Sequence, residues 1–203
     1  MAIKHILYGA SGHAKVVFEI AEALNIKIDA ILDDRPTAFN IFFKQKIIDP
    51  KNFDFKDCQL LLSIGNNQIR QKLSYKINQD FFSLIHPKAT ISPSSKIGHG
   101  SVIMAGAIIN AESFVGKHCI INTGAIIEHE CQIEDFAHIS PNAALAGNVK
   151  VGEGTQVGIG AQIIQGITIG KWATIGAGSV IIKDVPDFAT VVGNPGKIIK
   201  LKS

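Results

Sequence analysis

Three consecutive residues, Glu128, His129 and Glu130, are the strongest candidates for chemistry in this chain of 203 residues. The charge of a His side chain changes near neutral pH, and a neighbouring carboxylate can orient the ring and stabilise its protonated form. A general base needs that arrangement. A lone His on a turn is usually only solvated, but here carboxylates flank the ring and His138 follows nine residues later. We therefore predict that His129 is a general base.

The segment that must position this cluster repeats with a period of six residues. Each repeat begins with an aliphatic residue, and its fifth position is nearly always small. Glycines collect at the second and fourth positions, as tight corners between short strands require. This pattern predicts a parallel β-helix, in which large and small inward residues alternate and the coils stack. The aliphatic positions are Ile91, Ile97, Ile103, Ile109, Val115, Ile121, Ile127, Ile133, Ile139, Leu145, Val151, Val157, Ile163, Ile169, Ile175 and Ile181.

The repeat also predicts what lies next to His129. If three repeats make one coil, as in known hexapeptide folds, residue 147 stacks directly on residue 129, and residue 147 is Gly. A glycine there leaves a hollow beside the imidazole where a substrate could approach. The column of aliphatic residues alone buries too little surface to offset the entropy of ordering the array. We therefore expect the β-helix to pack against copies of itself.

Short apolar runs alternate with helical stretches before the repeats begin. This alternation implies a parallel sheet of the Rossmann-like βαβαβ type, in an α/β domain whose ligands bind at the carboxyl ends of the strands. The predicted strands are 3–8, 28–32, 59–64 and 81–85, with helices after residue 13 and over 68–77.

Polar residues follow three of these strands: Gly9 to His13, then Asp33-Asp34, then Gly65-Asn66. The first turn lacks the G-x-G spacing of a dinucleotide-binding fingerprint, although its backbone N–H groups could still hold a phosphate at a helix N-terminus. An acidic residue about twenty positions further on commonly holds a ribose hydroxyl. A helix-capping turn with solvated acids explains the first turn equally well. Three polar strand ends in one small domain favour a ligand site.

Residues that interrupt regular structure divide the chain into three predicted parts. Residues 1–86 form the predicted α/β domain, which His86-Pro87 closes because Pro interrupts regular structure. Residues 87–185 form the predicted β-helix. Residues 186–203 follow, in which two short strands around Gly193 to Lys197 would cap the end of the β-helix and reach a neighbouring subunit.

Composition excludes several classes of function. The net charge is +3 with scattered Lys and Arg, which argues against nucleic-acid binding and permits an anionic small molecule. The three Cys give no disulfide framework, and no apolar run suits a signal peptide or a membrane span, so we expect a cytoplasmic protein. Spacings of eleven and nine between His118, His129 and His138 do not match the H-x₄-H pair of zinc-carrying β-helices. We expect no metal.

The repeats, the opening Tyr8 to His13, the run Ile127 to Cys131, the segment Ala146 to Val149 and the tail Val192 to Pro195 resemble the bacterial sugar acyltransferases. Within these the chain is most similar to the UDP-4-amino-sugar N-acetyltransferases of the bacillosamine pathway, which serve protein glycosylation or surface polysaccharide. The resemblance covers nearly the whole chain. It implies a left-handed β-helix, a homotrimer, and acetyl-CoA in the groove between adjacent helices.

The resemblance also implies roles for individual residues. It makes His129 the catalytic base and Glu130 its orienter, with Asn122 nearby, in a direct transfer from acetyl-CoA to a sugar amine that needs no nucleophilic Cys. Ala177 stands where relatives often have Gly. The residues expected to contact acetyl-CoA are His138, Gly147, Ile159 and Ala177, and those expected to bind the nucleotide part of the sugar are Ser11, Gly12, His13, Asp33, Asp34, Gly65 and Asn66.

Two other functions fit the same residues. The first is O-acetylation of a sugar hydroxyl, as in the sialic-acid acetyltransferases, which share the same His and the same kind of first domain. The second is a trimeric scaffold without catalysis, in which the first domain only senses a nucleotide sugar. The Glu128-His129-Glu130 cluster counts against the scaffold, because the rest of the repeat array carries few groups suited to chemistry.

Overall fold

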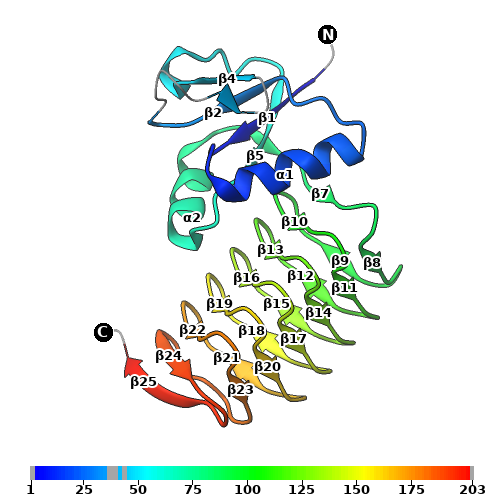
Figure 1. Cartoon of the computed structure of the whole chain (residues 1–203), viewed down its shortest axis with the longest axis vertical. Coiled ribbons are helices and arrows are strands. Elements are labelled where there is room, and N and C mark those ends of the chain that lie inside the picture. Colours follow the sequence, from blue (N-terminus) through cyan, green and yellow to red (C-terminus); the bar gives the residue numbers. More distant parts are fainter. Residues whose placement is uncertain (1–2, 36–40, 43–44, 202–203) are drawn as a thin grey trace.

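The computed structural model describes residues 3–35, 41–42 and 45–201. An α/β domain stands on one end of a β-helix, and a hairpin of two strands lies at the other end (Figure 1). Helix α1 lies between the sheet of the α/β domain and the first coils of the β-helix, and α2 lies at the side, next to those coils. The predicted order of an α/β domain followed by a β-helix is confirmed.

The α/β domain is built on a six-stranded sheet of order β3-β4-β2-β1-β5-β6, parallel except for the pairing of β3 with β4. Apolar side chains of α1 pack on one face of the sheet, and Leu73 of α2 packs on the other. Strands β3 and β4 were not predicted. The elements are β1 (Lys4–Tyr8), α1 (Gly12–Ala23), β2 (Ala30–Leu32), β3 (Ile41–Phe42), β4 (Gln45–Ile48), the 3₁₀ helix η1 (Pro50–Asn52), β5 (Cys58–Leu62), α2 (Asn67–Lys76) and β6 (Asp80–Phe81).

The prediction of one strand over 81–85 is wrong, because the chain leaves one sheet and enters another within that run. β6 pairs with β5 in the α/β domain, whereas β7 (Leu84–Ile85) pairs with β10 (Val102–Ile103) in the β-helix. The first coil thus begins before residue 86. A continuous apolar run cannot show such a change of sheet, since both halves of it need apolar side chains.

Within its coils the β-helix has three sheets of parallel strands that are only two residues long, and each coil takes 18 residues, so that Ile103 pairs with Ile121 and Ile121 with Ile139. Sheet I holds β7, β10, β13 (Ile120–Ile121), β16 (His138–Ile139), β19 (Gln156–Val157), β22 (Thr174–Ile175), β24 (Ala189–Val192) and β25 (Lys197–Leu201). Sheet II holds β8 (Thr90–Ile91), β11 (Ile108–Ile109), β14 (Ile126–Ile127), β17 (Ala144–Leu145), β20 (Gln162–Ile163) and β23 (Val180–Ile181). Sheet III holds β9 (Lys96–Ile97), β12 (Phe114–Val115), β15 (Gln132–Ile133), β18 (Lys150–Val151) and β21 (Thr168–Ile169).

The interior of the β-helix is arranged as the six-residue repeat predicts. From Ile103 onward the predicted aliphatic residues are buried, and the small residues fill the corners between them. Some of these small residues also fix the backbone: the hydroxyl of Ser113 donates to the carbonyl of Glu128 at 2.7 Å and accepts from the N–H of Cys131 at 3.1 Å. Cys119 and Cys131, at fifth positions of the repeat, are buried free thiols.

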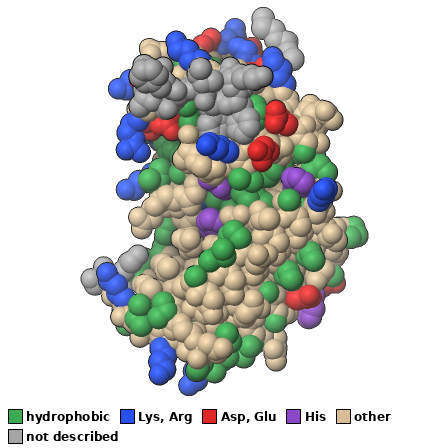
Figure 2. Space-filling model, in the orientation of Figure 1, with side chains coloured by type: hydrophobic (Ala, Val, Ile, Leu, Met, Phe, Trp, Pro, Cys, Tyr) green, Lys and Arg blue, Asp and Glu red, His purple; other side chains and the backbone are tan. Residues whose placement is uncertain are grey.

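The outer faces of the three sheets differ. The outward residues of sheet I at its first coils, Leu84, Val102 and Ile120, are buried with the apolar residues of α1. Those of sheet III include Lys96 and Lys150, which are exposed. Sheet II presents no charged side chain from its strands, since its outward residues are Thr90, Ile108, Ile126, Ala144, Gln162 and Val180. The face of the β-helix turned toward the viewer in Figure 2 likewise shows few charged groups.

One arginine joins the two parts of the molecule. Arg70 of α2 is 1% exposed, and its guanidinium donates to the carbonyls of His118 and Phe136 in successive coils, each at 2.8 Å. It also donates to the carbonyl of Ile64 at 2.9 Å. Burial lowers the pKa of Arg70 to about 10. The loop after β5 is therefore tied to the β-helix through this side chain.

The C-terminal strands lie on either side of the predicted turn. β24 adds to sheet I beside β22, and β25 returns antiparallel to β24. Ile198, Ile199 and Leu201 of β25 are all exposed in the single chain. This hairpin thus continues sheet I at the end of the molecule farthest from the α/β domain (Figure 1).

Candidate active site

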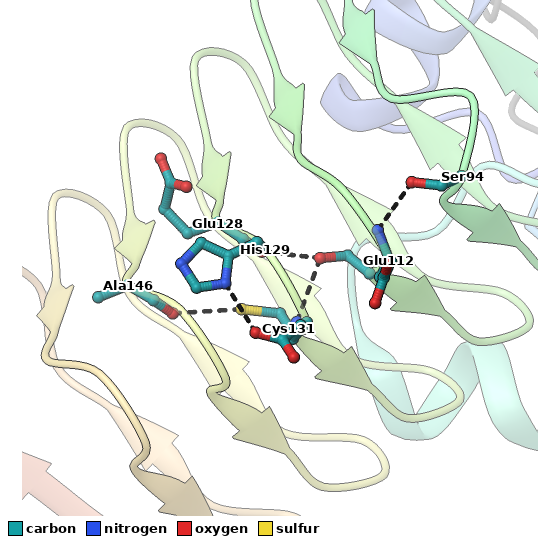
Figure 3. A network of polar contacts seen from close by, with 8 residues as sticks. Ser94, Glu112, Glu128, His129, Cys131 and Ala146 are labelled. Atoms are coloured by element: carbon teal, nitrogen blue, oxygen red, sulfur yellow. Dashed lines mark hydrogen bonds and ion pairs between the residues drawn. The ribbon is translucent and has the colours of Figure 1, made fainter.

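The His129 cluster occupies the corner between sheets II and III, where the chain turns from β14 to β15. The Nδ1 atom of His129 lies 3.0 Å from Oε2 of Glu130 (Figure 3). The carboxylate of Glu128 points away from the imidazole in the same view. Both members of the His129–Glu130 pair are more than half exposed, at 58% and 59%. An exposed ion pair contributes little to stability, so the pair serves orientation more than folding.

The backbone of this corner is fixed by the coils on both sides. The N–H of Asn148 donates to the carbonyl of His129 at 2.9 Å, and the N–H of Glu130 donates to the carbonyl of Ala111 at 2.9 Å. Glu130 has a φ of +60°, a left-handed backbone conformation that residues other than Gly seldom adopt. When Nδ1–H donates to Glu130, the lone pair of Nε2 is free to accept a proton.

Gly147 stacks on His129, as the repeat predicted. A Cβ atom at position 147 would lie 2.5 Å from Cε1 and 2.6 Å from Nε2 of His129. Any larger residue would therefore push the imidazole out of its place. The space that the missing Cβ leaves at Gly147 is thus occupied by the imidazole itself, which packs against the backbone of the next coil, and the predicted hollow is not seen.

Asn122 and His138 form a second group, at the corner between sheets I and II. Nδ2 of Asn122 lies 3.0 Å from Nε2 of His138, whose ring is buried, and the ring of His13 lies 6.5 Å away. Burial, together with the positive charge of Arg70, lowers the pKa of His138 to about 3 and that of His13 to about 4. Figure 2 shows His side chains where the α/β domain meets the β-helix.

The two groups of predicted active-site residues thus occupy different corners of one chain. Ile159 and Ala177, predicted to contact acetyl-CoA, follow β19 and β22 and lie one coil apart at the same corner as Asn122. Their stacking is direct, because the N–H of Gly178 donates to the carbonyl of Ile159 at 2.8 Å. Strand β14 of sheet II separates this corner from His129.

Three of the predicted nucleotide-binding residues, Ser11, Asp33 and Asp34, line one cavity of about 150 Å³. Ser11 is the N-cap of α1, which begins at Gly12, and its side chain makes no capping hydrogen bond. The carboxylate of Asp33 accepts from the backbone N–H of Ala10 at 3.0 Å and so holds the turn in shape. The hydroxyl of Tyr8 donates to Asp34 at 2.7 Å.

The other predicted nucleotide-binding residues lie elsewhere. His13 packs toward His138, and Gly65 lies beside His13, since a Cβ at Gly65 would be 3.9 Å from Cβ of His13. The side chain of Asn66 accepts from the N–H of Ile69 at 3.0 Å, which makes it the N-cap of α2. The three polar strand ends therefore do not all meet in one cavity.

Known proteins match both parts of the chain. Residues 4–77 match the model of the PglD N-terminal domain, and residues 148–183 match the bacterial transferase hexapeptide model of six repeats. A stretch of 106 residues is 43% identical to the UDP-N-acetylbacillosamine N-acetyltransferase of Bacillus subtilis. That match covers 48% of this chain and 49% of the relative, so the chain spans about half the length of this relative.

Solved structures match over nearly the whole chain. PerB from Caulobacter crescentus, solved with CoA and GDP-perosamine, is 38% identical with a TM-score of 0.90, and the match covers 97% of both chains. The chain belongs to the hexapeptide-repeat sugar N-acetyltransferases. The acetyltransferase domain of PglB from Neisseria gonorrhoeae, solved with acetyl coenzyme A, is 37% identical with a TM-score of 0.90. That match covers 98% of this chain and 100% of the neighbour, so the predicted family and the left-handed β-helix are confirmed.

Sequence patterns did not single out Arg70 or Tyr8 of this N-acetyltransferase. Arg70 is one polar residue of an amphipathic helix, and nothing in its spacing shows that it points into the β-helix. Tyr8 closes an apolar strand and looks like a core residue until its hydroxyl is seen to reach Asp34. In the part of the chain that the structure describes, no group of three or more His, Cys, Asp or Glu could hold a metal ion. No described helix is long and apolar enough to cross a membrane.

The buried His residues make the stability of this protein depend on pH. The ring of His118 stacks on Phe136 at 5.3 Å, and burial lowers its pKa to about 4. Because His13 and His138 are shifted in the same direction, the unfolded chain binds more protons than the folded one below pH 6.5. Stability is therefore fully present above about pH 6.5 and is lost as the pH falls toward 4.

The loss of stability can be measured as the change in Tm between about pH 8 and about pH 4. We expect the Tm to fall across the lower part of that range and to fall less in His118→Phe, whose ring keeps the stacking on Phe136. The carboxyl of Asp29, with a pKa lowered from 3.8, destabilises the fold only at lower pH and does not obscure the effect. A Tm that stays constant from pH 7 to 4 would contradict the assignment.

Proposed function

We propose that this N-acetyltransferase transfers the acetyl group of acetyl-CoA to the 4-amino group of a nucleotide-linked sugar, with His129 as the general base. The observation that carries the proposal is the His129–Glu130 pair at 3.0 Å, in which the imidazole packs on Gly147 and remains 58% exposed. A UDP-linked sugar is the first candidate, because the Bacillus subtilis relative is named for a UDP-linked substrate. The cytoplasm is the proposed compartment.

The proposed chemistry is direct transfer. The neutral amine attacks the thioester carbonyl, and Nε2 of His129 takes a proton from the amine as the new C–N bond forms. A backbone N–H donor stabilises the tetrahedral oxyanion, which collapses and expels the CoA thiolate, and the imidazolium returns the proton to that sulfur. A Cys nucleophile does not fit, since Cys58, Cys119 and Cys131 are buried and burial raises the pKa of each thiol.

The separation of the two corners supports a homotrimer with shared sites. Sheet II carries no charge on its outward strand residues and lies between the His129 corner and the Asn122 corner. If sheet II of each copy faces the three-fold axis, the His129 corner of one copy meets the Asn122 corner of the next. Acetyl-CoA would then lie along the column of Ile159 and Ala177, where Ile159 is 53% exposed.

Release of CoA thiol across a panel of substrates tests the function. We expect thiol release with a nucleotide-linked 4-amino sugar and little with the analogue that has a hydroxyl at the same carbon. Preference for the hydroxyl analogue would favour the O-acetyltransferase. No release with UDP-, GDP- and dTDP-linked amino sugars would favour the scaffold without catalysis.

Replacing Asp33 tests the nucleotide site. Asp33→Ala removes the acceptor that holds the N–H of Ala10 and so loosens the turn ahead of α1. We expect the KM for the nucleotide sugar to rise about tenfold or more, as loss of a hydrogen bond to a charged group does, with the KM for acetyl-CoA nearly unchanged. Equal increases in both KM values would contradict a nucleotide site in this domain.

A further inference from the structure

The corner between sheets III and I carries aromatic side chains in several coils and holds none of the residues assigned to catalysis. Trp172, the only Trp of the chain, lies at this corner, between Gly154 in the coil before it and Phe188 in the coil after it. Gly154 has a φ of +65°, and a Cβ atom there would lie 2.3 Å from Cζ3 of Trp172. The indole therefore packs against the backbone of Gly154, while Trp172 as a whole stays only half-buried.

Two cavities, of about 310 Å³ and about 180 Å³, border this indole, and Trp172 and Gln68 line both of them. Together they form a groove around the ring, the Trp172 groove. The larger cavity alone falls within the range of roughly 300–1,000 Å³ that is typical of sites for small molecules. Its other lining residues are Gln71, Lys72 and Phe188, and the smaller cavity includes Gln156 and Thr174 of sheet I.

Helix α2 forms one wall of the Trp172 groove, and hydrogen bonds hold this wall in place. The side-chain amide of Asn67 donates to the carbonyl of Gly154 at 3.0 Å and accepts from the guanidinium of Arg70 at 2.9 Å. The same Gly154 supports the indole, so both walls are fixed to one point of the β-helix. Residues 68, 71 and 72 lie on one face of α2, because their spacing is i, i+3 and i+4.

Polar side chains without partners surround the indole. The N–H of the Trp172 ring, the amides of Gln68 and Gln156 and the hydroxyl of Thr174 make no hydrogen bond within the part of the chain that the structure describes. Amides and hydroxyls both donate and accept. Among the described lining residues of the Trp172 groove, Lys72 carries the only charge. The groove thus offers an aromatic face with neutral hydrogen-bonding groups around it.

We propose that the Trp172 groove binds a neutral saccharide, with a sugar ring on the indole. A pyranose ring has apolar C–H groups on its faces and hydroxyls around its edge, so it can lie on an aromatic face while its hydroxyls reach the amides. An anionic ligand such as a phosphate would meet one cation only, and burying an unpaired charge is costly. This second sugar site goes beyond the proposed function, since the groove contains none of the residues assigned to acetyl transfer.

The Trp172 groove stays open in the proposed trimer. Sheet II faces the three-fold axis in that arrangement, and the corner between sheets III and I lies opposite sheet II in the coil. The corner is therefore the part of each β-helix farthest from the neighbouring copies. A bound saccharide there would not compete with the shared acetyl-CoA site.

The fluorescence of Trp172 tests this proposal directly, because no other Trp contributes to the signal. The full chain is titrated with glucose, galactose and N-acetylglucosamine in separate experiments. We expect at least one sugar to change the emission saturably, with a Kd on the order of 1 mM, which is the affinity that a ligand of this size commonly reaches. Absence of a saturable change with all three sugars, up to about a hundred times that concentration, would overturn the proposal.

A matched pair of variants locates the bound sugar. Gln68→Ala removes an exposed amide that lines both cavities, whereas Gln132→Ala removes an exposed amide on sheet III, outside the groove. Neither side chain has a hydrogen-bond partner among the described residues, so the fold should not change. We expect Gln68→Ala to raise the Kd for the sugar about three- to tenfold, as loss of one hydrogen bond does, and Gln132→Ala to leave it unchanged. An unchanged Kd in Gln68→Ala, or an equal rise in both variants, would place the sugar elsewhere and contradict the proposal.

Uridine is the competing ligand, because its base can also stack on an indole. It should change the emission of Trp172 less, or with a higher Kd, than the best of the three sugars. If uridine binds at least as tightly and also depends on Gln68, the groove accepts any flat ring and the assignment to a saccharide is wrong. These titrations need no acetyl transfer. A protein that binds sugar at Trp172 but releases no thiol would contradict the proposed function alone, and an active enzyme without sugar binding at Trp172 would contradict the groove alone.

Discussion

His129→Ala is expected to lower kcat by about 10²–10⁴-fold, which is the typical contribution of a positioned general base. The carboxylate of Glu130 holds Nδ1, which leaves the lone pair of Nε2 to accept the proton of the amine. The side chain is 58% exposed, so its loss should leave the fold and the oligomer intact. Steady-state release of CoA thiol gives kcat, and light scattering checks the mass.

Variants of three nearby residues should change kcat and KM to different extents. Glu130→Ala removes the orientation of the ring but not the proton acceptor, so its kcat should lie between those of wild type and His129→Ala. Gly147→Ala should also lower kcat, because its Cβ would displace the imidazole, while the fold at this corner stays the same. His138→Ala should instead raise the KM for acetyl-CoA, with a smaller loss in kcat.

The pH profile provides an independent check on the base. Because the base must be neutral to accept a proton, kcat should rise with pH through one ionisation, and His129→Ala should lack this rise. His138 and His13 cannot supply the ionisation, since burial holds their pKa values at about 3 and about 4. If His129→Ala keeps nearly wild-type kcat at neutral pH, the base lies elsewhere or the amine needs none.

The β-helix could be predicted from the sequence because each of its coils repeats the same local requirement. An inward aliphatic residue every six positions fixes both the strand and its register, so the stacking of Gly147 on His129 followed from counting. No such repeat governs the α/β domain. There the run 81–85 divides between two sheets. Strands β3 and β4 were not predicted, because short strands near a sheet edge carry little periodicity in hydrophobic residues.

The candidate site could be predicted only in its local parts. Glu130 is adjacent to His129 in the chain, so a sequence can show that they meet. Sequence position does not show which corner of the β-helix a residue occupies relative to a neighbouring copy, and Asn122 was grouped with His129 although β14 lies between them. Asn66, predicted to bind the nucleotide, also caps α2, and the sequence does not separate these two roles because both favour the same short amide side chain.

Ile126→Lys tests the shared site, and it is the variant with the largest expected effect on assembly. Ile126 faces outward from β14 of sheet II, the strand that leads into the His129 corner. In the proposed trimer, each copy would bring a Lys into the apolar interface around the three-fold axis, and burying unpaired charges there is strongly unfavourable. We expect light scattering to give the mass of a monomer, and activity to fall at least as far as in His129→Ala.

Gln132→Lys is the matched control for this variant. It introduces the same side chain on the next strand of the same coil, but on sheet III, where Gln132 is exposed and Lys150 lies directly above it in register. This variant should remain trimeric and active. If the site were complete in one chain, an Ile126→Lys monomer would keep its activity, because neither the His129–Glu130 pair nor the Asn122–His138 pair contains Ile126. Loss of activity together with loss of the trimer is expected only if the His129 corner needs the Asn122 corner of another copy.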